Sequence, residues 1–436
     1  MSTAPIVQDE RLPYQQLRYQ ALRDDALADD QDQSARNSRI FVHGSLIACL
    51  ILQRFGGMPG GSALFISLPL FALLLGWGLA SGIATLRPRG MALYFVFAAC
   101  TLLSTLIALT TPDGRFGTSV PSMIAILVTY SFTMVGPSAR FDRTTVFRLF
   151  LAYTRFIAAA GIVQWAVQFV GIRIFSFMVT MPALKPVLVE PQFNFNPILH
   201  YGSTILRSNG FFLLEPSMFS QTLVIAVVID YFILGRVKYL PLYLVAYMLS
   251  FSGTGALSLA LAVPFYACLS ARNFGRVAGF AIAGVIALTL GSIVFPEQVG
   301  SMLSRTNELS YSGSSGYARF IGPFLPIAEL SHEARILIGW GPGATERYLY
   351  FKEGTGNSIA KLITDYGAIG ITAFLAMFAG TLWRRETAIL SVLALTTFII
   401  GGGYLLFTPM LVLLFLLCIW GGTAPDDLGL KLRPAG

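Results

Sequence analysis

Charged residues are scarce in this chain. Asp, Glu, Lys and Arg together make up 12% of the 436 residues, whereas hydrophobic residues make up 55%. A water-soluble protein with so few charges would expose too much apolar surface. Apolar runs of about 18 residues or more recur along the chain, and each is long enough to cross a bilayer as a helix. The composition therefore predicts an all-α polytopic membrane protein.

Signatures of soluble enzymes and of metal centres are also missing. The sequence contains no P-loop, no dinucleotide-binding glycine fingerprint, no HExxH motif and no GxSxG motif. The four cysteines, Cys49, Cys100, Cys268 and Cys418, fall in apolar runs without metal-ligand spacing, which predicts buried structural thiols. We therefore expect no metal and no cofactor. Energy for any reaction must come from the substrate or from an ion gradient.

The apolar runs predict about twelve membrane-spanning helices. Their expected positions are Phe41–Gln53, Ala63–Leu86, Met91–Thr110, Val120–Gly136, Leu149–Val170, Phe219–Leu234, Leu240–Phe251, Ala256–Ser270, Val277–Phe295, Ile359–Leu382, Ala388–Ile400 and Tyr404–Trp420.

Basic residues recur in alternate short loops, and this bias predicts the orientation. With the N-terminus in the cytoplasm, most of the 30 Lys and Arg residues face inward, and the net charge of +8 needs no nucleic acid to explain it. The inward loops carry Arg87 and Arg89, Arg140, Arg143 and Arg148, Arg236 and Lys238, Arg272 and Arg276, Arg384 and Arg385, and Lys431 and Arg433.

The chain divides into a membrane domain with two polar tails. Residues 1–39 are polar and predict a largely disordered cytoplasmic tail, residues 40–422 form the membrane domain, and residues 423–436 form a second cytoplasmic tail. Two exterior loops are long, at about 171–215 and 296–355. Loops of such length usually have a function. Together they would line a cavity for an amphiphile with its polar head outside and its lipid tail in the bilayer.

The exterior loops contain arginines that topology bias does not explain. One lies in RSNGFFLLEPS, from Arg207 to Ser217, just before an apolar helix. A guanidinium binds phosphate oxygens in bidentate fashion and stabilises a diphosphate leaving group without a metal. The alternative is that these arginines pair with loop glutamates. The candidate phosphate-binding residues are Arg207, Arg305, Arg319 and Arg335.

Three further features have two interpretations each. His200 and His332 are either bases or simply solvated loop residues. Arg155 and Asp230 lie inside predicted spans; snorkelling to the headgroups is favoured for both, and the alternative for Arg155 is an internal polar site. The stretch SFSGTG, from Ser250 to Gly255, predicts a tight turn whose small residues let helices pack closely.

Three segments resemble one family. RSNGFFLLEPS resembles the segment that leads into a membrane helix in bacterial Wzy-type polysaccharide polymerases and O-antigen ligases. GYARFIGPFLPIAEL at 316–330, followed by GWGPG at 339–343, is similar to that family's second large periplasmic loop. Asn357, nine residues and then Gly367-Ala-Ile-Gly370 resemble the ligase pattern of a His-Asn pair, nine residues and GxxG. Order, spacing and expected sidedness agree in all three.

The resemblance implies a multi-pass protein of the bacterial inner membrane with a GT-C-like helical fold and a periplasmic active site. It implies glycan transfer from an undecaprenyl diphosphate carrier to an acceptor hydroxyl, without nucleotide or metal. Carried onto this chain, Arg207 and Arg319 hold the diphosphate or glycan, and Glu215 matches the family's acidic position. The catalytic candidates are thus Arg207, Glu215 and Arg319, and the substrate-binding candidates are Arg305, His332, Arg335 and Asn357.

One departure bears on the particular reaction. The ligase histidine is Gly356 here, which favours a repeat-unit polymerase of exopolysaccharide synthesis, of the xanthan kind, over a ligase. It also leaves the general base open among Glu215, His332 and Glu333. Expected partners are the lipid-linked oligosaccharide and membrane lipid, with a flippase and a chain-length co-polymerase beside the protein. A transporter or flippase is the alternative from another class, although the long loops do not follow a two-halves pattern.

Overall fold

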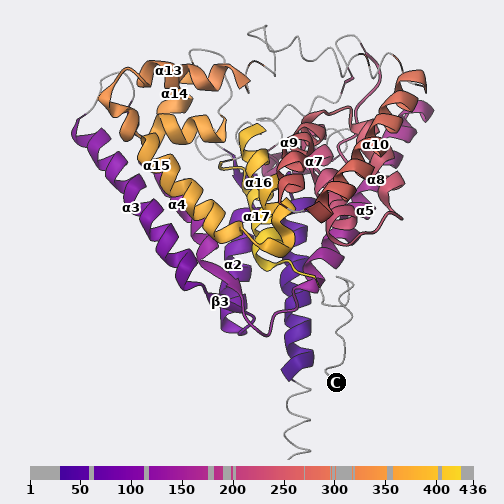
Figure 1. The fold of residues 1–436 in the computed structure, drawn as a ribbon, viewed down its shortest axis with the longest axis horizontal. Coiled ribbons are helices and arrows are strands. Elements are labelled where there is room, and N and C mark those ends of the chain that lie inside the picture. Colours follow the sequence, from indigo (N-terminus) through magenta and orange to yellow (C-terminus); the bar gives the residue numbers. More distant parts are fainter. Residues whose placement is uncertain are drawn as a thin grey trace, which may run out of the picture.

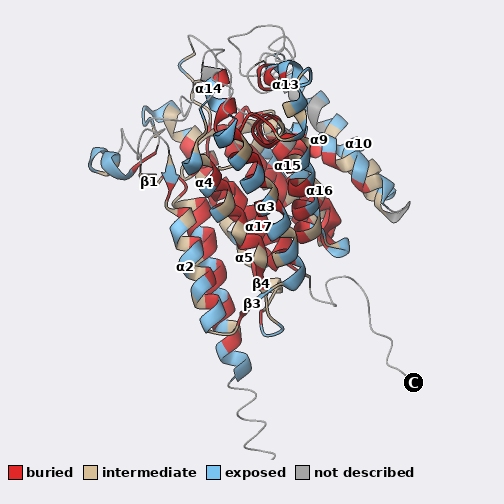
Figure 2. Ribbon diagram, turned by 90° about the vertical axis from the view of Figure 1, so that its left-hand side faces the viewer, coloured by how far each residue is buried: buried red, intermediate tan, exposed pale blue. Residues whose placement is uncertain are grey.

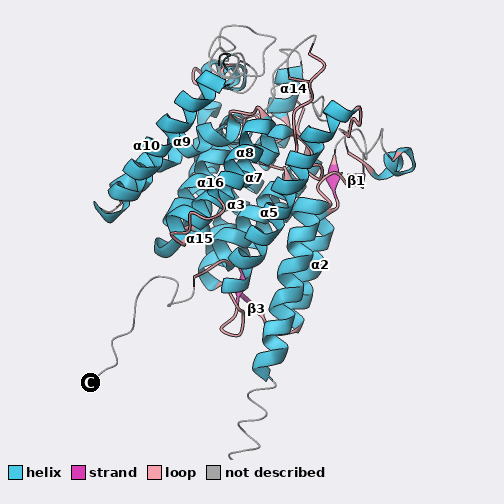
Figure 3. Ribbon diagram, turned by 90° about the vertical axis from the view of Figure 1, so that its right-hand side faces the viewer, coloured by secondary structure: helices cyan, strands magenta, loops and turns pink. Residues whose placement is uncertain are grey.

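The computed structural model describes residues 30–57, 63–111, 117–174, 181–189, 198–199, 203–269, 271–294, 320–350, 357–400 and 405–423, with single residues at 296, 300 and 317. Helices dominate this part of the chain, and the strands form two short antiparallel pairs (Figure 3). The α-helices are α2 (Ser67–Ala80), α3 (Pro88–Thr110), α4 (Val120–Ser131), α5 (Thr144–Ala166), α7 (Pro216–Val227), α8 (Leu240–Ser250), α9 (Thr254–Cys268), α10 (Ala271–Val294), α13 (Leu325–Leu330), α14 (Ala344–Tyr350), α15 (Ser358–Leu382), α16 (Ala388–Ile400) and α17 (Thr408–Phe415).

The remaining elements are short. Strand β1 (Gly56–Gly57) pairs with β2 (Leu64–Phe65), and β3 (Ala84–Leu86) pairs with β4 (Val135–Pro137). Three π-helical segments continue α-helices; they are η1 (Ile47–Ile51), η7 (Val228–Ile233) and η12 (Leu416–Trp420). The 3₁₀ segments include η4 (Val167–Val170), η5 (Pro182–Val187), η9 (Gly322–Phe324) and η10 (Ala334–Leu337).

Each predicted span overlaps a helical stretch, although several of these helices are shorter than the predicted span. Four helical stretches are long and apolar enough to cross a bilayer by themselves: Pro88–Thr110, Thr144–Val170, Pro216–Ile233 and Ser358–Leu382. Others, including α2, α8 and α9, are apolar but 10–17 residues long. The protein is therefore an all-α membrane protein, as its composition predicts.

Residues 30–39, which the sequence assigned to the N-terminal tail, are helical and continue through residue 46 into η1. Contacts with the loop before α5 explain this helix. Ser34 Oγ donates to Arg140 O at 2.7 Å, and Arg140 Nη1 pairs with Asp30 at 3.3 Å. Asp30 also precedes the helix body, where a carboxylate interacts favourably with the helix dipole. A polar composition alone did not reveal these long-range contacts.

Burial separates central helices from lipid-facing ones. Helix α17 and η12 are buried along their whole length, and α7 is nearly so. Figure 2 shows many exposed residues on outer helices such as α2 and α10, and mostly buried residues toward the centre. A helix that is apolar on all sides belongs in the interior. In contrast, α3 exposes Phe95 and Leu106, and α10 exposes Ile282 and Ile293. Such side chains are suited to contact with acyl chains.

The chain's loops gather at two opposite ends. Strands β3 and β4 lie at the lower end in Figure 1, where α3 begins and α5 follows. Helices α13 and α14 lie at the upper end, above α15, which runs beside α3. Ser119 N donates to Pro342 O at 2.7 Å, so the turn before α4 contacts the segment before α14. The basic loops around β3 and β4 thus lie opposite the end that carries α13 and α14.

The turn predicted at SFSGTG joins α8 to α9. Phe251 adopts a left-handed conformation with φ of 46°. Gly255 approaches α7 so closely that a Cβ would lie 2.6 Å from Ser220 O. Close packing of small residues at this turn is therefore confirmed.

Candidate functional site at the loop-bearing end

The segment RSNGFFLLEPS forms a tight turn, and a side chain of α5, Gln164, binds its backbone. Gly210 and Phe211 both have positive φ, of 70° and 66°. Gln164 Oε1 accepts from Asn209 N at 3.1 Å and from Phe211 N at 3.2 Å, and Gln164 Nε2 donates to Asn209 Oδ1 at 2.9 Å. Because Gln164 is buried, these bonds fix the turn from the protein interior.

The start of α7 is fixed by two neighbouring residues in the turn after η1, Gln53 and Arg54. Arg54, which is 1% exposed, donates from Nε to Leu213 O at 2.9 Å and from Nη2 to the same oxygen at 2.6 Å. Gln53 Oε1 accepts from Leu214 N at 2.8 Å. Pro216 at the first helical position needs no N–H partner. Residues far apart in sequence thus position the residue that precedes the helix.

Glu215 and Arg207 lie on opposite sides of this turn, and both are half-buried. Glu215 is the N-cap residue of α7, where the helix dipole favours a carboxylate, and its Oε2 accepts from Ser217 Oγ at 2.8 Å. Arg207 Nη2 donates to Leu199 O, which ties the turn to the preceding loop. The structure therefore positions one cation and one anion just before a membrane helix.

The GWGPG motif packs against a break in α15. Gly367 has φ of 68° and ψ of −170°, a conformation outside the helix that favours glycine. Trp340 N donates to Thr364 O at 2.8 Å and Gly341 N donates to Asp365 O at 3.0 Å. A Cβ on Gly339 would lie 2.5 Å from the Asp365 carbonyl carbon, so only glycine permits this approach.

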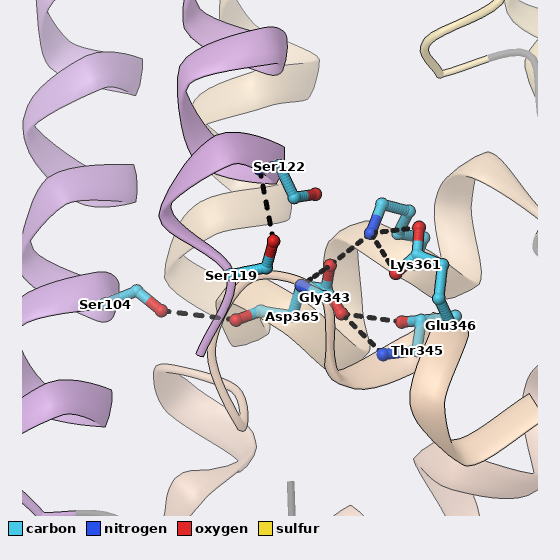
Figure 4. A network of polar contacts seen from close by, with 8 residues as sticks. All are labelled: Ser104, Ser119, Ser122, Gly343, Thr345, Glu346, Lys361 and Asp365. Carbon is cyan, nitrogen blue, oxygen red and sulfur yellow. Dashed lines mark hydrogen bonds and ion pairs between the residues drawn. The ribbon is translucent and has the colours of Figure 1, made fainter. Parts of the chain in front are cut away.

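A buried carboxylate locks the same motif onto α15 (Figure 4). Asp365, with no exposed surface, accepts from Gly343 N at 3.0 Å, Thr345 N at 2.9 Å and Thr345 Oγ1 at 2.7 Å. Lys361, one turn away, pairs with Asp365 and also with Glu346 Oε1 at 2.7 Å. The Glu346 side chain is 58% exposed. We call Lys361, Asp365 and Glu346 the α15 clamp.

Three residues predicted to bind substrate, Arg335, His332 and Asn357, lie on different elements of the same region. Arg335 Nη2 donates to Thr111 O, which connects η10 to the end of α3. His332 is exposed at the end of α13. Asn357 is fully buried, and its side-chain oxygen accepts from Ile359 N at 2.9 Å and Ala360 N at 3.3 Å, so it caps α15. The structure thus gives Asn357 a helix-capping role.

Acidic and aromatic residues near α14 are paired with one another. Glu333 Oε2 accepts from Trp340 Nε1 at 3.0 Å. Tyr348 Oη donates to Glu329 Oε1 at 2.6 Å, and burial, with this bond and the Glu329 charge, raises the pKa of Tyr348 to about 12. Trp340 is 1% exposed and Tyr348 is 7% exposed. Stacking of either ring on a sugar would need this cluster to open.

The predicted site residues fall into two groups. Arg207 and Glu215 precede α7, a helix on the right in Figure 1. His332 follows α13, Arg335 lies in η10 and Asn357 caps α15; α13 and α15 are on the left in that view. Arg305, Arg319 and His200 lie outside the described residues. Among the described residues, the predicted site residues thus form two groups, one at the turn before α7 and one around α13 to α15.

Sequence reasoning overlooked Lys361, Asp365 and Gln164. Lys361 and Asp365 are four residues apart in an otherwise apolar stretch, a spacing that places both on one helix face. This signal was available. Gln164 carries no such signal, because its importance comes from long-range bonds to the turn at 208–211.

Arg155 and Asp230 do not snorkel separately but form an internal pair. Arg155 Nη2 lies 3.1 Å from Asp230 Oδ2, and Asp230 is 1% exposed. Tyr243 Oη donates to the same oxygen at 2.8 Å, and the Arg155 guanidinium lies 3.6 Å from the ring centroid of Tyr239. The alternative of an internal polar site is correct for Arg155, and the snorkelling expected for Asp230 is wrong.

Comparisons add no family assignment. No protein-family model matches the sequence, and no curated protein matches it. Among the described residues, no group of three or more His, Cys, Asp or Glu side chains is placed to hold a metal ion. The site must therefore be interpreted from its own residues.

Proposed function

We propose that this protein is a polymerase of undecaprenyl-diphosphate-linked repeat units in exopolysaccharide synthesis. The observation that carries the proposal is the turn before α7. There, buried Gln164 and Arg54 hold the backbone that presents Arg207 and Glu215, at the end where the long loops gather. The resemblance of RSNGFFLLEPS, GWGPG and the Asn357–Gly370 spacing to the polymerase and ligase family supports the same function.

In the proposed reaction, the acceptor sugar hydroxyl attacks the anomeric carbon of the growing glycan. The new bond joins the hydroxyl oxygen to that carbon, and the bond from the carbon to the diphosphate oxygen breaks. Arg207 binds the diphosphate as its negative charge increases. The hydroxyl proton passes to a carboxylate or histidine, and Glu215 is the candidate nearest Arg207 in sequence. Arg319 and Arg305 are proposed to complete the anion site from the second loop.

The second group of residues, around α13 to α15, would position the loops that contact the substrate. The α15 clamp holds Gly343 and Thr345, and Arg335 ties η10 to α3. Both contacts fix the ends of loops that would surround the glycan. The buried pair of Arg155 and Asp230 would favour the alternative of transport, because intramembrane charges often mark ion pathways. Their mutual pairing and the bond from Tyr243 also fit a structural role.

The proposal includes about twelve spans in the bacterial inner membrane, both termini in the cytoplasm and the two long loops in the periplasm. A single cysteine at Ser331 or Lys185, in a background without the native cysteines, should react with an impermeant maleimide in intact spheroplasts. A cysteine at Leu86, on exposed β3, serves as the matched cytoplasmic control and should react only after lysis. Labelling of Leu86→Cys without lysis would refute this orientation.

Purified protein given undecaprenyl-diphosphate repeat units should extend them into longer lipid-linked chains. Cleavage of a glycosyl diphosphate supplies the driving force, so we expect extension with EDTA and without nucleotide. Chain length is measured by gel electrophoresis of the lipid-linked products. A strict requirement for a divalent metal would contradict the arginine mechanism.

A deletion strain separates the alternatives. For a polymerase, the strain should still present single repeat units on the periplasmic face and secrete no polymer. Complete polymer that stays on its lipid carrier would indicate the ligase. Repeat units retained on the cytoplasmic face would indicate the flippase.

A further inference from the structure

The end opposite the candidate site carries an arginine cluster that topology bias does not explain. Arg87, Arg89, Arg143 and Arg384 come from three segments: the start of α3, the start of α5 and the end of α15. Topology bias accounts for basic loops whose side chains extend into water. It does not account for a guanidinium that turns inward among other guanidinium groups.

Arg87 is the inward-facing member. Its Nη2 donates to Thr381 O at 3.2 Å, whereas its Nη1 is buried without an acceptor among the described residues. Gly136 makes room for the side chain, because a Cβ there would lie 2.4 Å from Arg87 Cδ. Burial lowers the pKa of Arg87, and the charges of Arg143, Arg384 and Arg89 lower it further. A buried N–H group without an acceptor is unfavourable until an anion reaches it.

An anion would also be favourable at the N-terminus of α3, the helix that starts at this cluster. Helix α3 has 23 residues, and Arg87 is its N-cap; its first turn contains no acidic residue. A cation is unfavourable at this positive end of the helix dipole, whereas an anion is stabilised there. Asp142, the nearest carboxylate before α5, is occupied by Thr144 N at 3.0 Å and Thr145 Oγ1 at 2.5 Å.

Acidic side chains neutralise little of the cluster within the described part of the chain. Glu386 pairs with Arg384 Nη2 at 3.2 Å, and its carboxylate is 59% exposed. Arg384 Nη1 donates to Gly421 O, and Gly422 packs against Arg143, which brings the end of η12 to the same place. One group of positive charges is therefore formed where five stretches of chain meet: the start of α3, β4, the start of α5, the end of α15 and the end of η12.

We propose that Arg87, Arg89, Arg143 and Arg384 bind a phosphate group at the start of α3. Guanidinium forks match phosphate oxygens, and the helix N-terminus adds partial positive charge. The phosphate belongs either to an acidic phospholipid of the adjacent leaflet or to a free anion. The site lies at the other end from Arg207, so it is independent of the proposed transferase chemistry.

The full chain, purified in a neutral detergent and depleted of lipid, tests this site. Phosphatidylglycerol binding is measured by native mass spectrometry, with phosphatidylcholine as the lipid control. We expect wild type to bind phosphatidylglycerol in preference, and Arg87→Gln and Arg384→Gln to bind it roughly tenfold more weakly. Lys238→Gln removes one exposed charge from the loop between η7 and α8 and should bind as wild type does.

Added inorganic phosphate distinguishes the two sources. Displacement of phosphatidylglycerol only at high phosphate concentration indicates a lipid headgroup, and equal binding of phosphate alone indicates a free anion. If Arg87→Gln fails to fold, Arg89→Gln replaces it, because Arg89 is exposed. Equal binding of the two lipids by wild type, or wild-type binding by the arginine variants, would overturn the proposal.

Discussion

Asp365→Ala should destabilise the protein by about 3–5 kcal/mol, because it leaves Lys361 as a buried charge without its closest partner. The same change removes the acceptor for Gly343 N, Thr345 N and Thr345 Oγ1. Thermal unfolding in detergent, with the protein level in membranes, measures the loss. The GWGPG segment should also become more accessible to proteolysis, since Gly343 N loses its bond to the Asp365 carboxylate.

Glu346→Gln is the matched control for this variant. It removes the other carboxylate that contacts Lys361, but from a side chain that is 58% exposed. Exposed pairs contribute about 0–1 kcal/mol, so we expect a small effect. Lys361→Met should fall between the two, because Asp365 would keep its three hydrogen bonds. A melting temperature for Asp365→Ala equal to that of Glu346→Gln would show that the α15 clamp does not hold the loop.

Hydropathy predicted the helices well because it reports a local property. A span such as Ala388–Ile400 is mostly apolar and carries no charge, and α16 has the same limits. The first helix was placed too late because its residues 30–39 are polar. Their helix depends on Ser34 and Asp30 meeting Arg140, a contact more than one hundred residues away in sequence. Periodicity in a window cannot contain that information.

In the candidate site, too, local features were predictable from the sequence and long-range contacts were not. The motif RSNGFFLLEPS was recognisable, and its position before a helix follows from Pro216 and the apolar run after it. The support from Gln164 and Arg54 was not predictable, because both are ordinary residues until the turn folds against them. The break at Gly367 was also hidden, since glycines are common in apolar helices and this one is required by its positive φ and by the approach of Leu337 and Ile338.

Two buried ion pairs hold neighbouring segments of this protein together. Arg155 and Asp230 join α5 to η7, whereas Lys361 and Asp365 both lie on α15 and bond to Glu346 and to Gly343 N. In hydrocarbon such groups are costly unless they are paired. Both pairs therefore help to specify which helices are neighbours. Arg207 differs from these residues because it is half-buried and lies before a predicted span, at the loop-bearing end, rather than within a span.

Arg207→Lys is expected to lower polymer output by about a hundredfold while the protein level in membranes stays normal. Lysine keeps the charge and one donor toward Leu199 O, which preserves the loop contact. It lacks the planar fork that binds two diphosphate oxygens at once, so leaving-group stabilisation should fall. Polymer yield in a deletion strain and initial rates with lipid-linked repeat units measure the effect, and the loss should appear mainly in kcat.

Lys185→Gln is the control in the same loop, because it removes an exposed charge from η5 without touching the turn before α7. We expect polymer output within about twofold of wild type, as for most surface substitutions. Full output from Arg207→Lys would remove the guanidinium from the reaction. A fall in protein level would instead show that Arg207 serves the loop, since a residue that acts on the diphosphate changes the rate and leaves the amount of folded protein unchanged.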